Sequence, residues 1–183
     1  MARARRQTYV ALLRGVNLGS RNKVSMPDLR RLVSDLGYGD VETYLQSGNV
    51  VFTAADGTDA VTAAVEKALA DELELRVAVL VRTKAELRRV VADNPFAGSQ
   101  SDPKKLLVTF LAETPSRSAV RMLDAAEHAP DEFHVRRREV YLHCPNGYGR
   151  TKLSNAFFER RLNVVGTNRN WRTVTALAEL ASA

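Results

Sequence analysis

The sequence predicts an α+β fold. Its N-terminal half has the ferredoxin-like order β-α-β-β-α-β, and a second, smaller α+β half of similar element order follows. Three observations favour this fold. Short β-rich runs alternate with helical patterns over residues 8–82, Gln46–Asn49 separates two strands in the manner of a hairpin turn, and the order of elements partly repeats after residue 104.

Local signals bound the elements of the first half. Thr8–Leu13 is β-rich and alternates loosely, which predicts a strand. Ser25 is a helix cap with Pro27 in the first turn, and Gly37 ends that helix. The other predicted elements of this half are strands at Val41–Leu45, Val50–Thr53 and Leu75–Val81 and a helix at Thr58–Leu73.

This topology brings two polar loops together. In a split β-α-β unit the first and second strands are parallel, with the third between them. The loop after the first strand, residues 14–23, should therefore lie beside the hairpin turn at Gln46–Asn49, where Gly48 or Asn49 supplies a positive φ. Two glycine-bearing polar loops at one sheet edge are a reasonable place for a binding site.

The second half begins after a third helix, in which Thr83 and Glu86 form a capping box. That helix stops at Asn94-Pro95-Phe96, and residues 98–103 are typical of a linker, so we expect domains at 8–93 and 104–183. The predicted elements are strands at Lys105–Leu111, Phe133–Arg137, Val140–Cys144 and Val164–Asn168 and helices at Ser116–His128, Lys152–Leu162 and Trp171–Leu180.

Composition indicates a cytoplasmic protein. The one cysteine, Cys144, excludes an intramolecular disulfide, and no apolar run approaches the roughly 20 residues of a membrane span. The basic start, Met1–Gln7, runs directly into a strand pattern, which is unlike a secretory signal.

Positive charge is concentrated in residues 136–172. This segment holds nine arginines and lysines against two glutamates, a net charge of +7, whereas the rest of the chain sums to about −1. Such a segment favours an anionic partner, either a small molecule or a nucleic acid, although a solvated surface would show the same composition.

Several blocks of the sequence resemble one known family. Tyr9–Asn17, Thr43–Phe52, Asn94–Phe96, Arg150–Arg160 and Thr167–Val174 look like signature segments of the Domain of Unknown Function 1697 family. The match runs in order from about Thr8 to Leu180, with minor departures at Leu18 and Ser154. The resemblance implies a stand-alone bacterial α+β protein, and it implies no activity.

The side chains in these blocks are mainly hydrogen-bond donors and cations, and carboxylates and histidines are nearly absent. This set suits recognition of phosphate or carboxylate groups better than acid–base catalysis. The predicted ligand-binding residues are Arg14, Asn17, Lys23, Gln46, Ser47, Asn49, Arg150, Lys152, Arg169 and Asn170.

Three other interpretations stay open. Arg14, Lys23, Lys152 and Arg169 could serve a phosphoryl- or nucleotidyl-transfer enzyme electrostatically. The blocks could instead form a protein-interaction module that holds the two halves together. Finally, the loop side chains could simply satisfy their own backbone.

No motif identifies a cofactor. The three histidines, His128, His134 and His143, are not spaced as a metal site, and Cys144 on a strand is more typical of a buried filler than of a nucleophile. Trp171 opens an amphipathic helix and is expected in the core, whereas Tyr148, between two glycines, is expected to be exposed.

Overall fold

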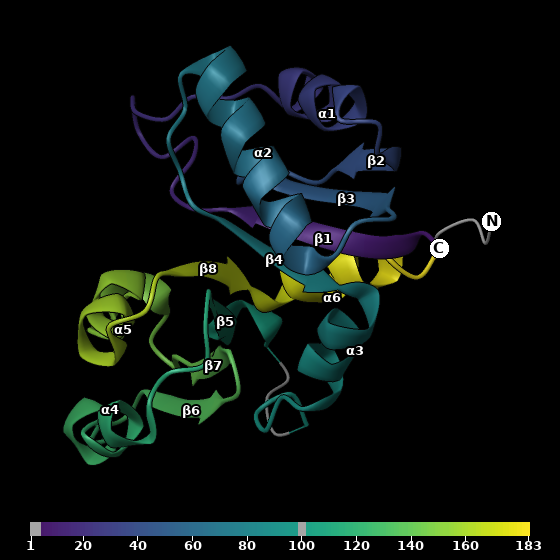
Figure 1. Cartoon of the computed structure of the whole chain (residues 1–183). Helices are drawn as coiled ribbons and strands as arrows, with labels where there is room; N and C mark the ends of the chain where they lie inside the picture. The colour runs from purple at the N-terminus through teal and green to yellow at the C-terminus, as the bar shows by residue number, and fades with distance from the viewer. Residues whose placement is uncertain (1–4, 99–101) are drawn as a thin grey trace. The chain divides into compact units, whose positions relative to one another are not determined.

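The computed structural model describes residues 5–98 and 102–183, which separate into two compact units (Figure 1). The first unit takes the described residues up to Arg89 together with Leu177–Ala183, and the second takes Val90–Ala176. Part of the predicted 98–103 linker therefore lies outside the described residues.

The first half of the chain forms a four-stranded antiparallel sheet in the order β2-β3-β1-β4, which is the predicted ferredoxin-like topology. Its elements are β1 (Gln7–Leu13), α1 (Met26–Asp35), β2 (Gly39–Thr43), β3 (Asn49–Ala54), α2 (Thr58–Leu73), β4 (Val79–Thr83) and α3 (Lys84–Ala92).

The core of this unit lies between one face of the sheet and the helices α1 and α2. Alternate residues of β1 and β3 point to that face, so Tyr9 pairs with Phe52 and Ala11 with Val50 across the strands. Leu29, Leu32 and Val33 of α1 and Val61, Val65 and Leu69 of α2 fill the other side of the core.

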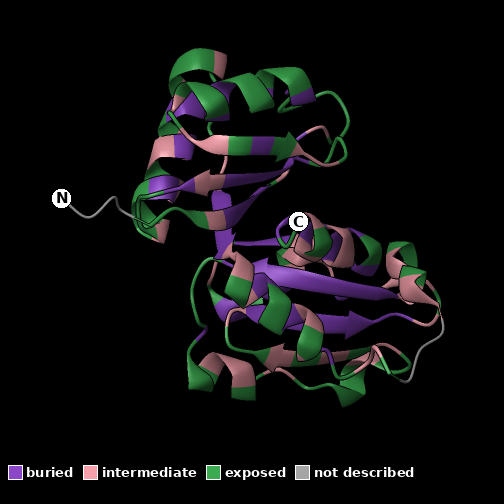
Figure 2. Cartoon of the chain, turned by 90° about the vertical axis from the view of Figure 1, so that its right-hand side faces the viewer, coloured by how far each residue is buried: buried purple, intermediate pink, exposed green. Residues whose placement is uncertain are grey.

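The second half repeats the strand order, because its sheet runs β6-β7-β5-β8 with every pair antiparallel. Its elements are β5 (Leu106–Leu111), α4 (Arg117–Arg121), β6 (Glu132–Arg136), β7 (Glu139–His143), α5 (Asn155–Leu162), β8 (Gly166–Asn170) and α6 (Trp171–Leu180). Leu107, Leu142, Leu153 and Phe158 belong to its core cluster. In both sheets the middle strands are buried while the helices keep exposed faces (Figure 2).

Several predicted boundaries were wrong, and three of them have an identifiable structural reason. β4 begins at Val79 and not at Leu75, because Val79 pairs with Leu13, the last residue of β1. β8 begins at Gly166, which likewise pairs with Leu111 at the end of β5. The helix predicted at Ser116–His128 stops at Arg121, and the Asp124 carboxylate then accepts a hydrogen bond from the Ala126 amide, which competes with helix continuation.

Candidate functional site

The loop after β1 and the hairpin between β2 and β3 lie together at one edge of the first sheet, as the topology predicted. Asn17 Nδ2 donates to the Gln46 carbonyl at 2.7 Å. The Leu13 amide donates to the Gly48 carbonyl at 2.8 Å. This edge therefore holds Arg14, Asn17, Lys23, Gln46, Ser47 and Asn49 in one region of the first unit.

Asn17 braces this region through every polar atom of its side chain. Its Nδ2 donates to the carbonyls of Val24 (2.8 Å) and Gln46 (2.7 Å), and its Oδ1 accepts from the Val24 amide (3.0 Å). Its backbone is in the left-handed region, with φ 55°, a conformation that asparagine tolerates better than most residues. The residue therefore fixes the shape of the loop, and its side chain has no hydrogen-bonding group left for a ligand.

Asn49 has the same kind of role in the hairpin. Its side chain is fully buried, and Nδ2 donates to the Tyr44 carbonyl (2.7 Å) and to Ser47 Oγ (2.9 Å). Gly48 takes φ 78°, so it supplies the positive φ of the predicted turn, and Leu45 is a second, unpredicted left-handed residue with φ 58°. The internal-bracing interpretation thus describes Asn17, Asn49 and the bond between Asn49 and Ser47.

Lys23 and Gln46 are different, because both side chains are exposed and line a hollow of ≈ 610 Å³. Neither side chain forms a hydrogen bond or ion pair within the part of the chain that the structure describes. The other residues that line this hollow are Asn17, Val24, Ser25, Asp28 and Leu73.

Positive charge dominates the two loops around this hollow. Residues 14–23 carry Arg14, Arg21 and Lys23 and no carboxylate, and residues 44–49 carry no charge at all. The one carboxylate in the lining, Asp28, accepts a hydrogen bond from Ser25 Oγ at 2.6 Å. The Asp28 amide in turn donates to Ser25 Oγ at 3.1 Å, so the N-terminus of α1 is already capped from within.

Two exposed leucines flank the bond that joins the loops. Leu18 is 71% exposed and follows Asn17, while Leu45 is 54% exposed and precedes Gln46. An exposed leucine in the left-handed region, as at Leu45, is unfavourable for both solvation and backbone conformation. The edge therefore offers apolar contact beside cations and amide donors.

Arg150 and Lys152 lie in the second unit, where both exposed side chains line a separate hollow of ≈ 260 Å³. They belong to the segment between β7 and α5, which contains the 3₁₀ turn Tyr148–Arg150. Tyr148 was expected to be exposed, but it is partly buried against the core, and its hydroxyl accepts a hydrogen bond from the Asn155 amide (3.2 Å).

Arg169 and Asn170 line neither hollow. Arg169 is only 7% exposed, and its Nη1 donates to Thr167 Oγ1 and to the Asn168 carbonyl, both at 2.8 Å. Burial lowers the pKa of Arg169 to about 10, which still leaves the guanidinium charged at neutral pH. Asn170 Oδ1 accepts from the Thr173 amide at 2.9 Å, so this side chain caps α6.

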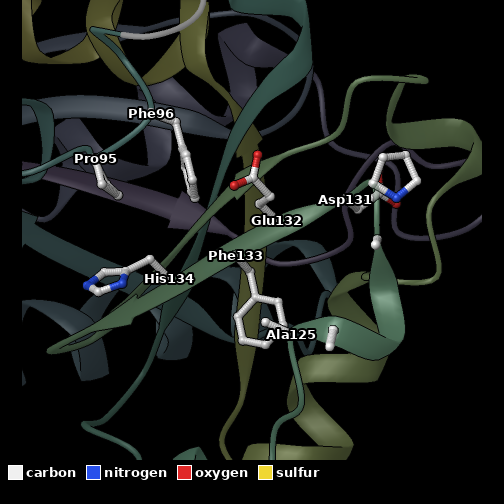
Figure 3. A pocket seen from close by; sticks show the side chains of 10 residues that line it. Pro95, Phe96, Ala125, Asp131, Glu132, Phe133 and His134 are labelled. Carbon is white, nitrogen blue, oxygen red and sulfur yellow. The ribbon is translucent and has the colours of Figure 1, made fainter.

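Sequence reasoning missed a contact between the buried imidazole of His143 and the exposed carboxylate of Glu132. His143 is 7% exposed, its Nδ1 lies 3.0 Å from Glu132 Oε1, and its Nε2 is buried without a hydrogen-bond partner. Glu132 and Phe96 line a further hollow of ≈ 430 Å³, and Figure 3 shows both side chains on the side of β6 opposite Phe133. The pairing register of β6 and β7 would have revealed this contact.

The basic segment 136–172 is not a continuous free surface. Arg136 and Arg137 both contact the Asp93 carboxylate, at 3.4 and 3.3 Å. Arg161 lies over the Phe157 ring at 5.5 Å, and Arg169 is buried. Much of the charge that favoured an anionic partner in the sequence is thus engaged inside the second unit.

Cys144 is buried and lies in the core of the second unit. Burial, with a smaller effect of the Asp131 charge, raises its pKa to about 11, although a hydrogen bond with Thr151 opposes the shift. Trp171 is buried as expected, at 8% exposure.

Across residues 5–98 and 102–183, no cluster of three or more His, Cys, Asp or Glu side chains is arranged to hold a metal ion. Over the same ranges, no helix has both the length and the apolar character needed to cross a membrane.

Comparison with known proteins bears on the fold and the family. The conserved bacterial protein SP0830 from Streptococcus pneumoniae is similar in structure, with a TM-score of 0.78 and 21% sequence identity. The similarity covers 97% of this chain and 99% of that protein, and at this identity it shows the fold alone. No curated protein matches the sequence. The model of the family described as "Protein of unknown function (DUF1697)" matches residues 6–141, and the chain therefore belongs to that family.

Proposed function

We propose that the edge of the first sheet binds a small phosphorylated molecule. The observation that carries this proposal is that Lys23 and Gln46 line the same hollow. Both line one hollow with polar groups that have no partner in the described chain, between loops that carry three cations and no carboxylate. An ammonium and a primary amide can together satisfy phosphate oxygens through charge-assisted and neutral hydrogen bonds.

The rigidity of the edge supports binding at this place. Asn17 and Asn49 hold the two loops through bonds of 2.7–3.0 Å, so the loop backbone needs little ordering when a ligand binds, and the ordering cost falls on the Lys23 and Gln46 side chains. The two bracing asparagines are therefore positioning residues, while Lys23 and Gln46 are the proposed contacts. The volume of ≈ 610 Å³ falls within the roughly 300–1,000 Å³ of small-molecule sites.

The exposed leucines suggest that the ligand has an apolar part as well. Leu18 follows Asn17 and Leu45 precedes Gln46 in the sequence, and both leucines are exposed. A nucleotide combines phosphates with a base that can lie on aliphatic side chains, so it fits this arrangement better than a bare phosphate. We therefore expect ADP to bind more tightly than inorganic pyrophosphate, which also carries two phosphorus atoms.

The test is calorimetric titration with pyrophosphate and ADP at low ionic strength. Lys23→Gln should weaken binding of both by about 10- to 150-fold, because one charge-assisted contact is worth about 1.5–3 kcal/mol. Arg30→Gln is the matched control, since Arg30 is an exposed cation on the same unit that does not line the hollow. If neither anion binds the native protein, or if Lys23→Gln binds as tightly as Arg30→Gln, the proposal is wrong.

A further inference from the structure

The hollow beside Arg150 and Lys152 has a lining of mixed charge. Two carboxylates, Glu127 and Asp131, come from the segment that leads into β6, and the two cations come from the segment that follows β7. β6 begins opposite the end of β7, since Glu132 pairs with His143, so the fold brings these segments to one end of the sheet. The remaining lining residues are His128, Ala129, Pro130 and Asn146.

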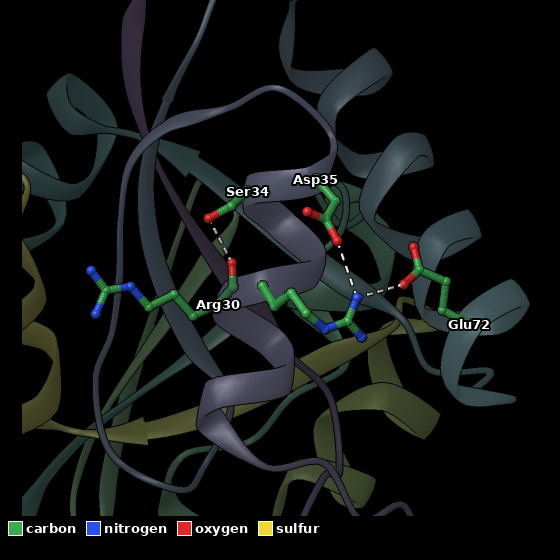
Figure 4. A network of polar contacts seen from close by, with 5 residues as sticks. Arg30, Ser34, Asp35 and Glu72 are labelled. Carbon is green, nitrogen blue, oxygen red and sulfur yellow. Dashed lines mark hydrogen bonds and ion pairs between the residues drawn. The ribbon is translucent and has the colours of Figure 1, made fainter.

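These opposite charges do not pair with each other. Within the described chain, none of the four side chains takes part in an ion pair or hydrogen bond. Some exposed charges elsewhere in the chain do form ion pairs. Arg31 contacts Asp35 at 3.0 Å and Glu72 at 3.3 Å (Figure 4).

Exposed opposite charges attract each other only weakly in water, so they do not have to form a direct contact. In this hollow the acidic and basic groups lie farther apart than the 4 Å of an ion pair. A ligand that carries both signs of charge can span such a gap, with each of its groups meeting an opposite charge. A ligand with only one sign would meet like charge on the other wall.

His128 contributes an aromatic ring to the lining of the hollow. The ring is held edge-on by Phe157 and Phe133, with ring centroids 5.0 and 6.3 Å away. Its Nδ1 is buried and has no hydrogen-bond partner among the described residues, and because almost none of its surface is accessible, a ligand in the hollow would contact other atoms of the ring.

We propose that this hollow binds a small zwitterion, a molecule with an ammonium group and an acidic group, such as a free α-amino acid. The ammonium group meets Glu127 and Asp131, and the carboxylate meets Arg150 and Lys152. The volume of ≈ 260 Å³ lies just below the range of about 300–1,000 Å³ for drug-sized ligands, which restricts the ligand to a small one. This site lies within the second unit and does not depend on the phosphate site of the first.

The experiment compares three forms of one molecule. L-alanine carries both charges, N-acetyl-L-alanine only the negative one, and L-alanine amide only the positive one. Thermal-shift and calorimetric titrations of the full chain should show binding of L-alanine, or of another free amino acid in a panel, and at least tenfold weaker binding of the two blocked forms of that amino acid. Equal binding of a blocked form would overturn the proposal, as would no binding of any free amino acid.

Two variants assign the binding to this hollow. Lys152→Gln and Glu127→Gln should each weaken amino-acid binding by about tenfold, the loss of one charge-assisted contact. Lys104→Gln and Glu113→Gln are the matched controls, because both residues are exposed and neither lines the hollow. All four substitutions are on the surface, so we expect the fold to tolerate them. Binding that survives in both Lys152→Gln and Glu127→Gln would place the amino acid elsewhere and overturn the proposal.

Discussion

Single side chains at the edge of the first sheet divide into two classes that look the same in the sequence. Asn17, Asn49 and Gln46 are all amides in glycine-bearing loops, and all three were predicted to bind a ligand. The first two are held by the backbone of the neighbouring loop, whereas the Gln46 side chain lines the hollow. Sequence patterns give the residue type but not the direction of the side chain, so this distinction required coordinates.

Asn17 offers a direct test of the bracing role. Asn17→Ala should lower the free energy of unfolding by about 2–4 kcal/mol, because it removes three hydrogen bonds and puts alanine at a left-handed φ. Asn17→Gly should cost about 1 kcal/mol less, since glycine accepts that φ. Urea denaturation followed by circular dichroism measures both. Gln46→Ala, the control, should change stability by less than about 0.5 kcal/mol.

Equal stability of the native protein and Asn17→Ala would show that the bracing bonds do not contribute to stability. The comparison also bears on ligand binding. If Asn17 only positions the loop, Asn17→Gly should weaken ligand binding less than Lys23→Gln does.

Cys144 should react slowly in the folded protein. Only the thiolate is nucleophilic, and a pKa of about 11 in place of 9.0 reduces the thiolate fraction near pH 8 by about 100-fold. Iodoacetamide labelling followed by mass spectrometry should therefore be slow in buffer and fast in guanidinium chloride. Burial favours the neutral Cys144 thiol in the folded protein. The stability that this preference contributes is complete below about pH 9 and is lost as the pH rises towards about 11. Rapid labelling of the folded protein near pH 8 would contradict this account.

Some element ends were predicted well from signals near the boundary, but the helix predicted from Lys152 begins at Asn155, after the Ser154 cap. The Ser25 cap and the Thr83–Glu86 capping box follow from side chains within a few residues of the boundary, and apolar periodicity predicted the full extent of α2 and α6. The starts of β4 and β8 were missed because a strand begins where its partner strand allows pairing. That information is not local in the sequence.

The Glu132–His143 pair shows that register can carry more information than periodicity. The hairpin between β6 and β7 turns at Arg137 and Arg138, so Arg136 faces Glu139 and, four residues further along each strand, Glu132 faces His143. Both strands were predicted from the sequence, but their register was not worked out. A tight two-residue turn would have been enough to place the carboxylate beside the imidazole.

Gly48 is the position at which the hairpin tolerates substitution least. It has φ 78°, and an added Cβ would lie 2.5 Å from Val16 Cγ2 and 2.9 Å from Leu13 Cβ. Gly48→Ala should therefore cost about 2–4 kcal/mol, the sum of backbone strain and overpacking. Gly149→Ala is the control, because that residue is outside the left-handed region and has no atom near its Cβ position. Similar melting temperatures for the two variants would refute this account of the turn.

At the scale of the whole molecule, net charge was a weaker guide to function than its distribution. The segment 136–172 carries +7 in the sequence, yet Arg136 and Arg137 contact Asp93 and Arg169 is buried. Composition cannot distinguish a cation that is exposed to solvent from one that forms an ion pair or is buried. The free cations that line the described hollows, Lys23 in one unit and Arg150 and Lys152 in the other, are few.

This distribution predicts a shallow salt dependence for nucleic acid. A single-stranded oligonucleotide that meets only Arg21 and Lys23 neutralises about two phosphates, so the slope of log affinity against log salt should be about −1.4. Fluorescence anisotropy over a range of salt concentrations measures this slope. Lys23→Gln should make it shallower by about 0.7, and Arg136→Gln, which removes a cation already in contact with Asp93, should leave it unchanged. A slope steeper than about −5 would require seven or more phosphate contacts, and it would identify a polymer rather than a small phosphorylated molecule as the ligand.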